Sequence, residues 1–96
     1  MLVLLREEAL EEIAAASAWY GRQRPELGSE FIAQVEQSIE LLADHPDAFP
    51  VVGSNIRRAL LRRFPFALYY RSLDTETIEV LAVLHQRRDL NPRLDG

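Results

Sequence analysis

The sequence predicts one α+β domain of order βααβββ, spanning residues 1–96, with a helical hairpin packed on a small, mainly antiparallel sheet. Two stretches of the first half repeat apolar residues at helical spacing. Three runs interpreted as strands follow, of which the last two are rich in Val, Ile, Leu and Tyr and are separated by a short polar link. A chain of 96 residues is long enough for one such domain and one core.

The first element is a short strand over Met1–Leu5, which is too short to cross a membrane and lacks a signal-peptide cleavage site. From Arg6 to about Arg24, apolar residues recur on one side of a helix and glutamates lie outside that stripe. Trp19 and Tyr20 near its end are expected to anchor the helices to the sheet, because their large rings supply much burial.

A second helix follows a break at Pro25–Gly28. It is expected to start near Ser29, whose hydroxyl can cap free N–H groups, and to stop at His45-Pro46. Because the connector is short, the two helices should form an antiparallel hairpin.

The second half is expected to form a meander of three strands. Asp47–Asn55 follows Pro46 directly, holds Pro50 and Gly53, and is interpreted as a loop. The strands are Ile56–Arg63, Phe66–Leu73 and Thr77–His85, and Asp74–Glu76 is a link of hairpin length.

The last strand is apolar on both sides. Side chains alternate along a strand, which puts Ile78, Val80, Ala82 and Leu84 on one face and Leu81, Val83 and His85 on the other. Since the helices can cover only one face, the second should be covered by the tail, Arg87–Gly96, by another copy or by a partner protein.

Charge is divided unevenly along the chain. Residues 1–48 hold ten acidic and three basic residues, and residues 49–96 hold five acidic and eight basic ones. All eleven basic residues are arginine, whose guanidinium binds phosphate or carboxylate through two parallel bonds, although codon bias explains the same preference equally well. The second half could therefore face an anionic partner.

Several basic residues could carry chemistry. The candidate arginines lie on strands or at strand ends, and Arg58 with Arg62 is the pair expected on one face. They could bind phosphate, or else shield an edge strand or pair with helix acids. His85 could act as a base towards a ribose 2′-hydroxyl, or be structural. The full set is Arg57, Arg58, Arg62, Arg63, Arg71, Arg87 and Arg88.

Other kinds of site find no support in the sequence. Cysteine is absent, which excludes disulfides, thiolate metal sites and cysteine nucleophiles. Metal-ligand spacing, a glycine-rich phosphate loop and a serine triad are also absent from the sequence. We therefore expect no metal and no small-molecule cofactor.

Two segments together resemble a known family. RRALLRRFPFALYYR, residues 57–71, followed by LAVLHQRR, residues 81–88, is similar to the central and C-terminal signatures of RelE/ParE toxins. The resemblance extends to Ala18–Tyr20 and to His45-Pro46, so it covers nearly the whole chain. It implies a cytoplasmic growth-inhibiting toxin of a type II toxin–antitoxin system, associated with plasmid stabilization, and a cognate antitoxin whose C-terminal segment wraps it. The antitoxin contacts expected from it are Tyr69, Leu81 and Val83.

The family divides by target, since RelE-like members cut mRNA on the ribosome and ParE-like members poison DNA gyrase. RelE-like proteins typically have tyrosine-arginine where this chain has Phe66-Ala67, and a tyrosine in the tail, which here has none. Losing one electrostatic contact to a transition state costs on the order of a hundredfold in rate. The ParE-like branch is therefore favoured, with a target surface of Arg58, Arg62, Arg71, His85, Arg87 and Arg88.

Two alternatives stay open. A ribosome-dependent nuclease would use His85 as base and Arg62, Arg71 and Arg88 on the phosphate. A binding module of the same fold without toxicity is the other.

Overall fold

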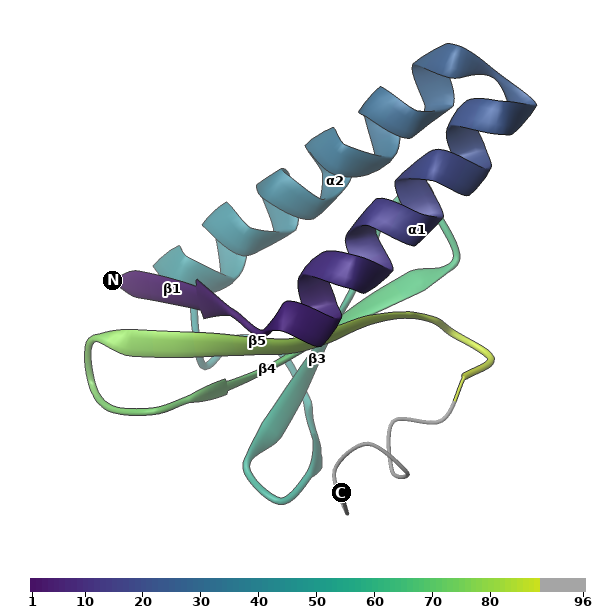
Figure 1. Cartoon of the computed structure of the whole chain (residues 1–96). Helices are drawn as coiled ribbons and strands as arrows, with labels where there is room; N and C mark the ends of the chain where they lie inside the picture. Colours follow the sequence, from purple (N-terminus) through teal and green to yellow (C-terminus); the bar gives the residue numbers. More distant parts are fainter. Residues whose placement is uncertain (89–96) are drawn as a thin grey trace.

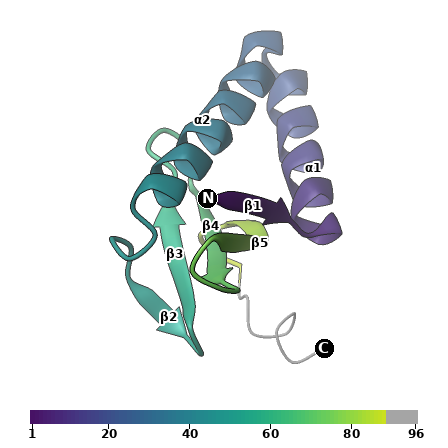
Figure 2. The same cartoon turned by 90° about the vertical axis from the view of Figure 1, so that its left-hand side faces the viewer.

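A computed structural model describes residues 1–88 and shows two helices on one face of a five-stranded sheet (Figures 1 and 2). The strand order is β1-β5-β4-β3-β2, in which β1 pairs parallel with β5 and every other neighbouring pair is antiparallel. This confirms the predicted α+β class. The elements are β1 (Leu2–Leu5), α1 (Glu7–Gln23), α2 (Pro25–Asp44), β2 (Val51–Gly53), β3 (Ile56–Leu60), β4 (Phe66–Ser72) and β5 (Thr77–His85).

The helical hairpin turns over one residue, Arg24, whose backbone is extended. Pro25 opens α2 instead of breaking it, because proline is tolerated in the first turn, where its missing N–H would have no helical partner. The expected start at Ser29 was therefore wrong: Ser29 lies inside α2, and no side chain caps this helix. No helix among residues 1–88 combines the length and apolarity needed to cross a membrane.

Gly28 lies at a close approach of the two helices. The Ser17 hydroxyl donates a hydrogen bond to the Gly28 carbonyl at 3.2 Å. A Cβ atom on Gly28 would lie 2.8 Å from the Ser17 carbonyl oxygen, closer than real Cβ atoms come to other atoms. Only glycine lets the hairpin close this tightly.

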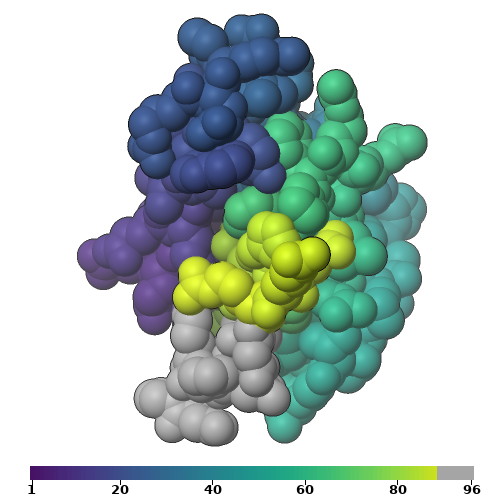
Figure 3. Space-filling model, turned by 90° about the vertical axis from the view of Figure 1, so that its right-hand side faces the viewer, coloured from purple at the N-terminus to yellow at the C-terminus, as the bar shows by residue number. Residues whose placement is uncertain are grey.

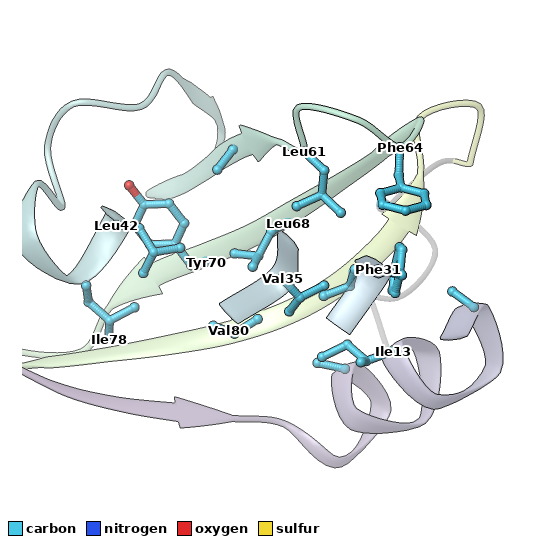
Figure 4. Close-up of a cluster of buried hydrophobic side chains, with 14 residues drawn as sticks. Ile13, Phe31, Val35, Leu42, Leu61, Phe64, Leu68, Tyr70, Ile78 and Val80 are labelled. Atoms are coloured by element: carbon cyan, nitrogen blue, oxygen red, sulfur yellow. The ribbon is translucent and has the colours of Figure 1, made fainter. Parts of the chain in front are cut away.

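The main core lies between the hairpin and the sheet (Figure 4). Tyr20 stacks on Phe31 with ring centroids 5.6 Å apart, and Phe31 meets the edge of Phe64 at 5.3 Å. Tyr20 thus anchors α1 as predicted, whereas Trp19 does not, since it is 51% exposed. Adjacent helical residues lie about 100° apart around the axis, so the two rings cannot both face the sheet.

A short extra strand, β2, lies in the segment expected to be a loop. It pairs with β3 at Ile56 and Arg57, and the Arg58 N–H then donates to the Pro50 carbonyl at 3.0 Å. Pro50 has no N–H with which to return that bond, so the pairing stops there. β3 itself ends at Leu60, three residues earlier than predicted.

A β-bulge at Leu81 changes which face the end of β5 presents. Tyr69 pairs with Ala82 and Tyr70 with Val80, so Leu81 is an extra residue in β5. Val83 consequently joins the core under the helices. The predicted alternation is right for Ile78 and Val80 and wrong for the residues beyond the bulge. On the opposite face lie Ile56, Ala67, Tyr69, Leu81, Ala82 and Leu84.

This second cluster is buried within the single chain. The far face of the sheet is therefore not the exposed apolar surface that would by itself demand another copy or a partner. The part of the tail expected to help cover it falls on residues 89–96, outside the described residues.

Candidate functional site

The predicted arginines fall into two groups, and the first is engaged in holding the fold. The Arg57 guanidinium donates to the Phe49 carbonyl at 2.7 Å and to the Asp47 carbonyl at 3.2 Å. It also lies 3.7 Å from the Asp47 carboxylate. Arg57 thus fastens the connection between α2 and β2 to the sheet.

Arg71 is also engaged. Its Nε and Nη2 both lie 3.0 Å from Oε1 of Glu79, the residue opposite it on β5. Arg6, between β1 and α1, approaches the other carboxylate oxygen at 3.5 Å. Because two guanidinium groups share the half-buried Glu79 carboxylate, Arg71 fits a role in fastening three elements together better than its predicted role in target binding.

The second group is free of ion pairs within residues 1–88. It consists of Arg58, on β3, together with Arg62, Arg87 and Arg88, all with exposed side chains. Arg63 also belongs to the surface, because its contact with Glu30 is long, 3.9 Å, and such exposed pairs contribute about 0–1 kcal/mol.

Four arginines gather at one end of the sheet. The Leu61 N–H donates to the Phe66 carbonyl at 2.9 Å, and the Gln86 N–H donates to the Pro65 carbonyl at 2.8 Å. These bonds bring the β3–β4 connection beside the turn after β5, as Figure 3 shows for the green and yellow segments. We name this region the arginine end, comprising Arg62, Arg63, Arg87 and Arg88.

Arg58 does not belong to the arginine end. It lies on β3 beside Tyr69 of β4, on the face away from the helices. The expected alternation with Arg62 is lost, because β3 stops at Leu60 and Arg62 belongs to the bend that follows.

His85 lies at the arginine end, but its ring holds the turn together. Nδ1 accepts a hydrogen bond from the Arg87 N–H at 3.1 Å, and the His85 carbonyl accepts one from the Arg88 N–H at 2.9 Å. A neutral imidazole with Nδ1 as acceptor carries its proton on Nε2. The nitrogen that could take up a proton is therefore already occupied, which does not favour His85 as a general base.

Ala67, at the position where the resemblance implies an arginine in a nuclease, is fully buried in the second cluster and lies opposite Leu60 on one side and Leu84 on the other. A guanidinium could not be placed there without opening this cluster. The chain's own packing thus argues against a phosphate-binding arginine at position 67.

The three residues predicted to contact an antitoxin do not form one surface. Val83 lies under the helices, whereas Tyr69 and Leu81 lie on the opposite face. Their exposed fractions are 1%, 6% and 0%, so all three are core residues of the isolated chain.

An apolar hollow beside the arginine end was missed by the sequence reasoning, which assigned Trp19 to the core. Helical spacing is the signal that could have found it, because a Tyr20 ring packed against the core turns Trp19 outwards. The hollow opens where α1, the β3–β4 connection and the end of β5 meet. It is lined by Ala16, Trp19, Tyr20, Pro65, Phe66 and His85.

No metal site accompanies these features in the described part of the chain, where no three His, Cys, Asp or Glu side chains gather closely enough to hold an ion. Within residues 1–88 the site combines an apolar hollow with exposed guanidinium groups. Such a combination suits recognition of a protein or nucleic-acid surface.

Comparisons with known proteins agree with this fold. Residues 3–90 match the family model described as ParE toxin of type II toxin-antitoxin system, parDE. A chain of the chromosomal ParDE system from P. aeruginosa superposes with a TM-score of 0.74 at 19% identity, covering 88% of this chain and 95% of that one. No curated protein sequence matches the chain.

Two E. coli structures are also similar. A chain of the intact RelBE toxin-antitoxin complex gives a TM-score of 0.66 at 21% identity, covering 91% of this chain and 98% of that one. The isolated RelE toxin gives 0.65 at 19% identity, covering 98% and 93% respectively. At these identities the structural likeness establishes the fold.

Proposed function

Because the chain belongs to the ParE toxin family of type II toxin–antitoxin systems, we propose that it inhibits DNA gyrase by binding it, without cutting nucleic acid. A cognate antitoxin keeps the chain inactive in the cell. The target surface is the arginine end with the neighbouring hollow around Trp19.

One observation carries the choice of gyrase over the ribosome, namely the buried Ala67 at the position where the ribonuclease branch has a phosphate-binding arginine. Two further contacts support it. Nδ1 of His85 is occupied by the Arg87 N–H, and Arg71 is bound to Glu79. Of the groups that a nuclease would use, an arginine at position 67 is replaced, Nδ1 of His85 is occupied and Arg71 is paired, whereas Arg62 and Arg88 stay exposed and can serve a binding surface.

The family and two of the similar structures, from ParDE and RelBE toxin–antitoxin systems, support an antitoxin as partner. The acidic first half of the chain and the exposed arginines of the second half offer opposite charges to different parts of one partner.

The test is a supercoiling assay with purified gyrase and relaxed plasmid. We expect inhibition that increases with the concentration of the chain and is relieved by the antitoxin. Undiminished supercoiling at a large excess of folded chain would contradict the proposal.

A second assay tests whether the chain instead acts as a ribosome-dependent ribonuclease. Translating ribosomes with a defined mRNA should show no cleavage when the chain is added. Cleavage that disappears in the variant Arg62→Ala would instead identify a ribosome-dependent nuclease. Normal growth on expression without antitoxin would identify a non-toxic binding module.

A further inference from the structure

The hollow at Trp19 is walled mainly by aromatic rings. Four of its six lining residues carry a ring, namely Trp19, Tyr20, Phe66 and His85. Its volume is about 420 Å³, within the roughly 300–1,000 Å³ that is typical of small-ligand sites. Size and lining together suit the entry of one flat ring.

Contacts between neighbouring rings hold these walls in place. Trp19 meets Tyr20 edge to face, with ring centroids 5.1 Å apart. Phe66 lies 6.1 Å from Tyr20, and His85 lies 5.4 Å from Phe66. Each ring is therefore fixed by the next one. Trp19 is nevertheless 51% exposed, so part of its indole surface stays open for a ligand to stack on.

Two of the lining side chains bring a hydrogen-bond donor. The indole N–H of Trp19 can only donate. His85 carries its proton on Nε2, because Nδ1 accepts the Arg87 N–H at 3.1 Å. Donors of this kind favour a ring whose edge carries oxygen or nitrogen acceptors. Nucleobases have such edges, whereas the ring of phenylalanine does not.

Guanidinium groups flank the hollow on two sides. Arg63 precedes Pro65 by two residues and Arg87 follows His85 by two, so each backbone lies within about 7 Å of a lining residue. Residues 61–66 and 85–88 hold four arginines and no acidic residue, and no lining residue carries a carboxylate. The net charge of −4 is therefore not the local charge here. Guanidinium groups bind phosphate through two parallel bonds.

An aromatic hollow flanked by arginines suits a nucleotide of an unpaired strand. Inside a duplex a base is stacked on both faces and paired at its edge, so only an unpaired base could enter. Proteins that hold single strands combine aromatic side chains, on which bases stack, with basic groups along the backbone. The acidic first half of the chain would repel a strand from the rest of the molecule, which confines it to the arginine end.

We propose that the hollow and the arginine end bind single-stranded DNA, with one unpaired base stacked on Trp19 and the neighbouring phosphates on the arginines. DNA is preferred to RNA because gyrase, the proposed target, acts on DNA. The inference rests on the proposed function for that preference alone, and binding is measured without gyrase.

Trp19 is the only tryptophan of the chain, so its fluorescence reports occupation of the hollow. A thymidine oligonucleotide of about 12 nucleotides should quench this fluorescence at about 50 mM salt, with a Kd of about 1–100 μM. A duplex of the same length should bind at least about fivefold more weakly. Absence of quenching up to about 1 mM oligonucleotide would overturn the proposal, even if gyrase inhibition were observed.

Two further probes separate other occupants of the hollow. Binding of a uridine oligoribonucleotide about tenfold tighter than the DNA strand would overturn DNA as the occupant. A short peptide with one phenylalanine between aspartates is the second probe. Quenching by this peptide but not by the oligonucleotide would overturn the proposal in favour of a protein ligand.

Variants of the ring test the stacking contact, with the anisotropy of a labelled oligonucleotide as readout. Trp19→Leu keeps an apolar side chain at this exposed position but removes the ring, and should weaken binding by about fivefold or more. Trp19→Phe keeps a ring and should lose less. Equal losses in the two variants would contradict stacking. Thermal unfolding checks that both remain folded.

Variants of the arginines test the phosphate contacts. Arg87→Ala should make the fall of log K with log salt concentration less steep, by about 0.7 for one lost phosphate contact. Arg58→Ala is the matched control, because Arg58 is exposed on the face away from the helices. It should leave both the affinity and the slope unchanged. Equal effects of the two variants would indicate general charge attraction and contradict a site at the arginine end.

Discussion

The backbone N–H of Val83 donates a hydrogen bond to the carboxylate of Glu12 at 3.0 Å, joining residues 71 positions apart. The bond lies where β1 has ended, so that β5 continues with β4 on one side and no strand on the other. A side chain of α1 therefore does what a strand would otherwise do. The sequence places the glutamates of this helix outside its apolar stripe, and the structure gives one of them, Glu12, a structural role.

Glu12→Ala should lower the free energy of unfolding by about 1.5–3 kcal/mol, because it leaves the partly buried Val83 N–H without its acceptor. Glu12→Gln should lose less, since its amide oxygen can still accept. Urea unfolding measures both. Glu11→Ala, at the neighbouring exposed position, is the control, and an equal loss there would refute a special role for Glu12.

Gly28→Ala should destabilise the chain by about 1–3 kcal/mol, because the new methyl group would force Ser17 and the two helices apart. Gly21 provides a matched control within the same hairpin, since a Cβ there meets nothing within 4 Å. Gly21→Ala should instead stabilise the chain by up to about 1 kcal/mol through helix propensity. Thermal unfolding of the two variants distinguishes these opposite signs.

Tyr70 should make stability fall at alkaline pH. Burial raises the pKa of Tyr70 above its ordinary 10.0, with Arg57 lowering it and Asp47 raising it. Below pH 10.0 the side chain is protonated in both states, and above it the unfolded state ionises first, so stability is lost as pH rises.

Tyr70→Phe should show a smaller alkaline loss of stability than the parent chain. It should also lose about 1–2 kcal/mol at neutral pH, because the hydroxyl donates to the Pro46 carbonyl at 2.7 Å. Unfolding curves from about pH 7 to about pH 11 test both expectations. An identical alkaline slope in parent and variant would remove Tyr70 as the cause.

The arginine end should matter for the target and not for the fold. The double variant Arg87→Ala/Arg88→Ala should weaken gyrase inhibition about tenfold, or about 1.4 kcal/mol, with little change in thermal stability. Arg22→Ala, an exposed arginine elsewhere, should leave inhibition unchanged. Arg57→Ala should show the reverse pattern and lose stability, because its guanidinium holds Asp47 and Phe49.

Sequence reasoning predicted most of the secondary structure, and its errors have local causes. The start of α2 was placed at Ser29 because proline was taken as a break, although it is acceptable in a first turn. β2 was missed because the prolines and glycine around it are typical of loops. Only two residues of β2 pair with residues of β3, and they do so because the β3 backbone lies beside them.

The candidate site was predicted less completely. The sequence indicated the arginines but not which of them are free, since Arg71 and Glu79 become neighbours only through the pairing of β4 with β5. The hollow at Trp19 is likewise formed by residues of α1 together with Pro65 and His85. These residues are far apart in the chain, and only the fold brings them together.

By itself, the sequence determined the family and the order of every element except β2, because helical and strand periodicities and the signature segments are properties of neighbouring residues. Only the tertiary structure decided which face each residue of β5 presents, since the bulge at Leu81 arises from pairing with β4. It also decided which edge stays open, because Pro50 ends one pairing and Glu12 closes another across distant parts of the chain. Such contacts depend on long-range packing, which local periodicity does not encode.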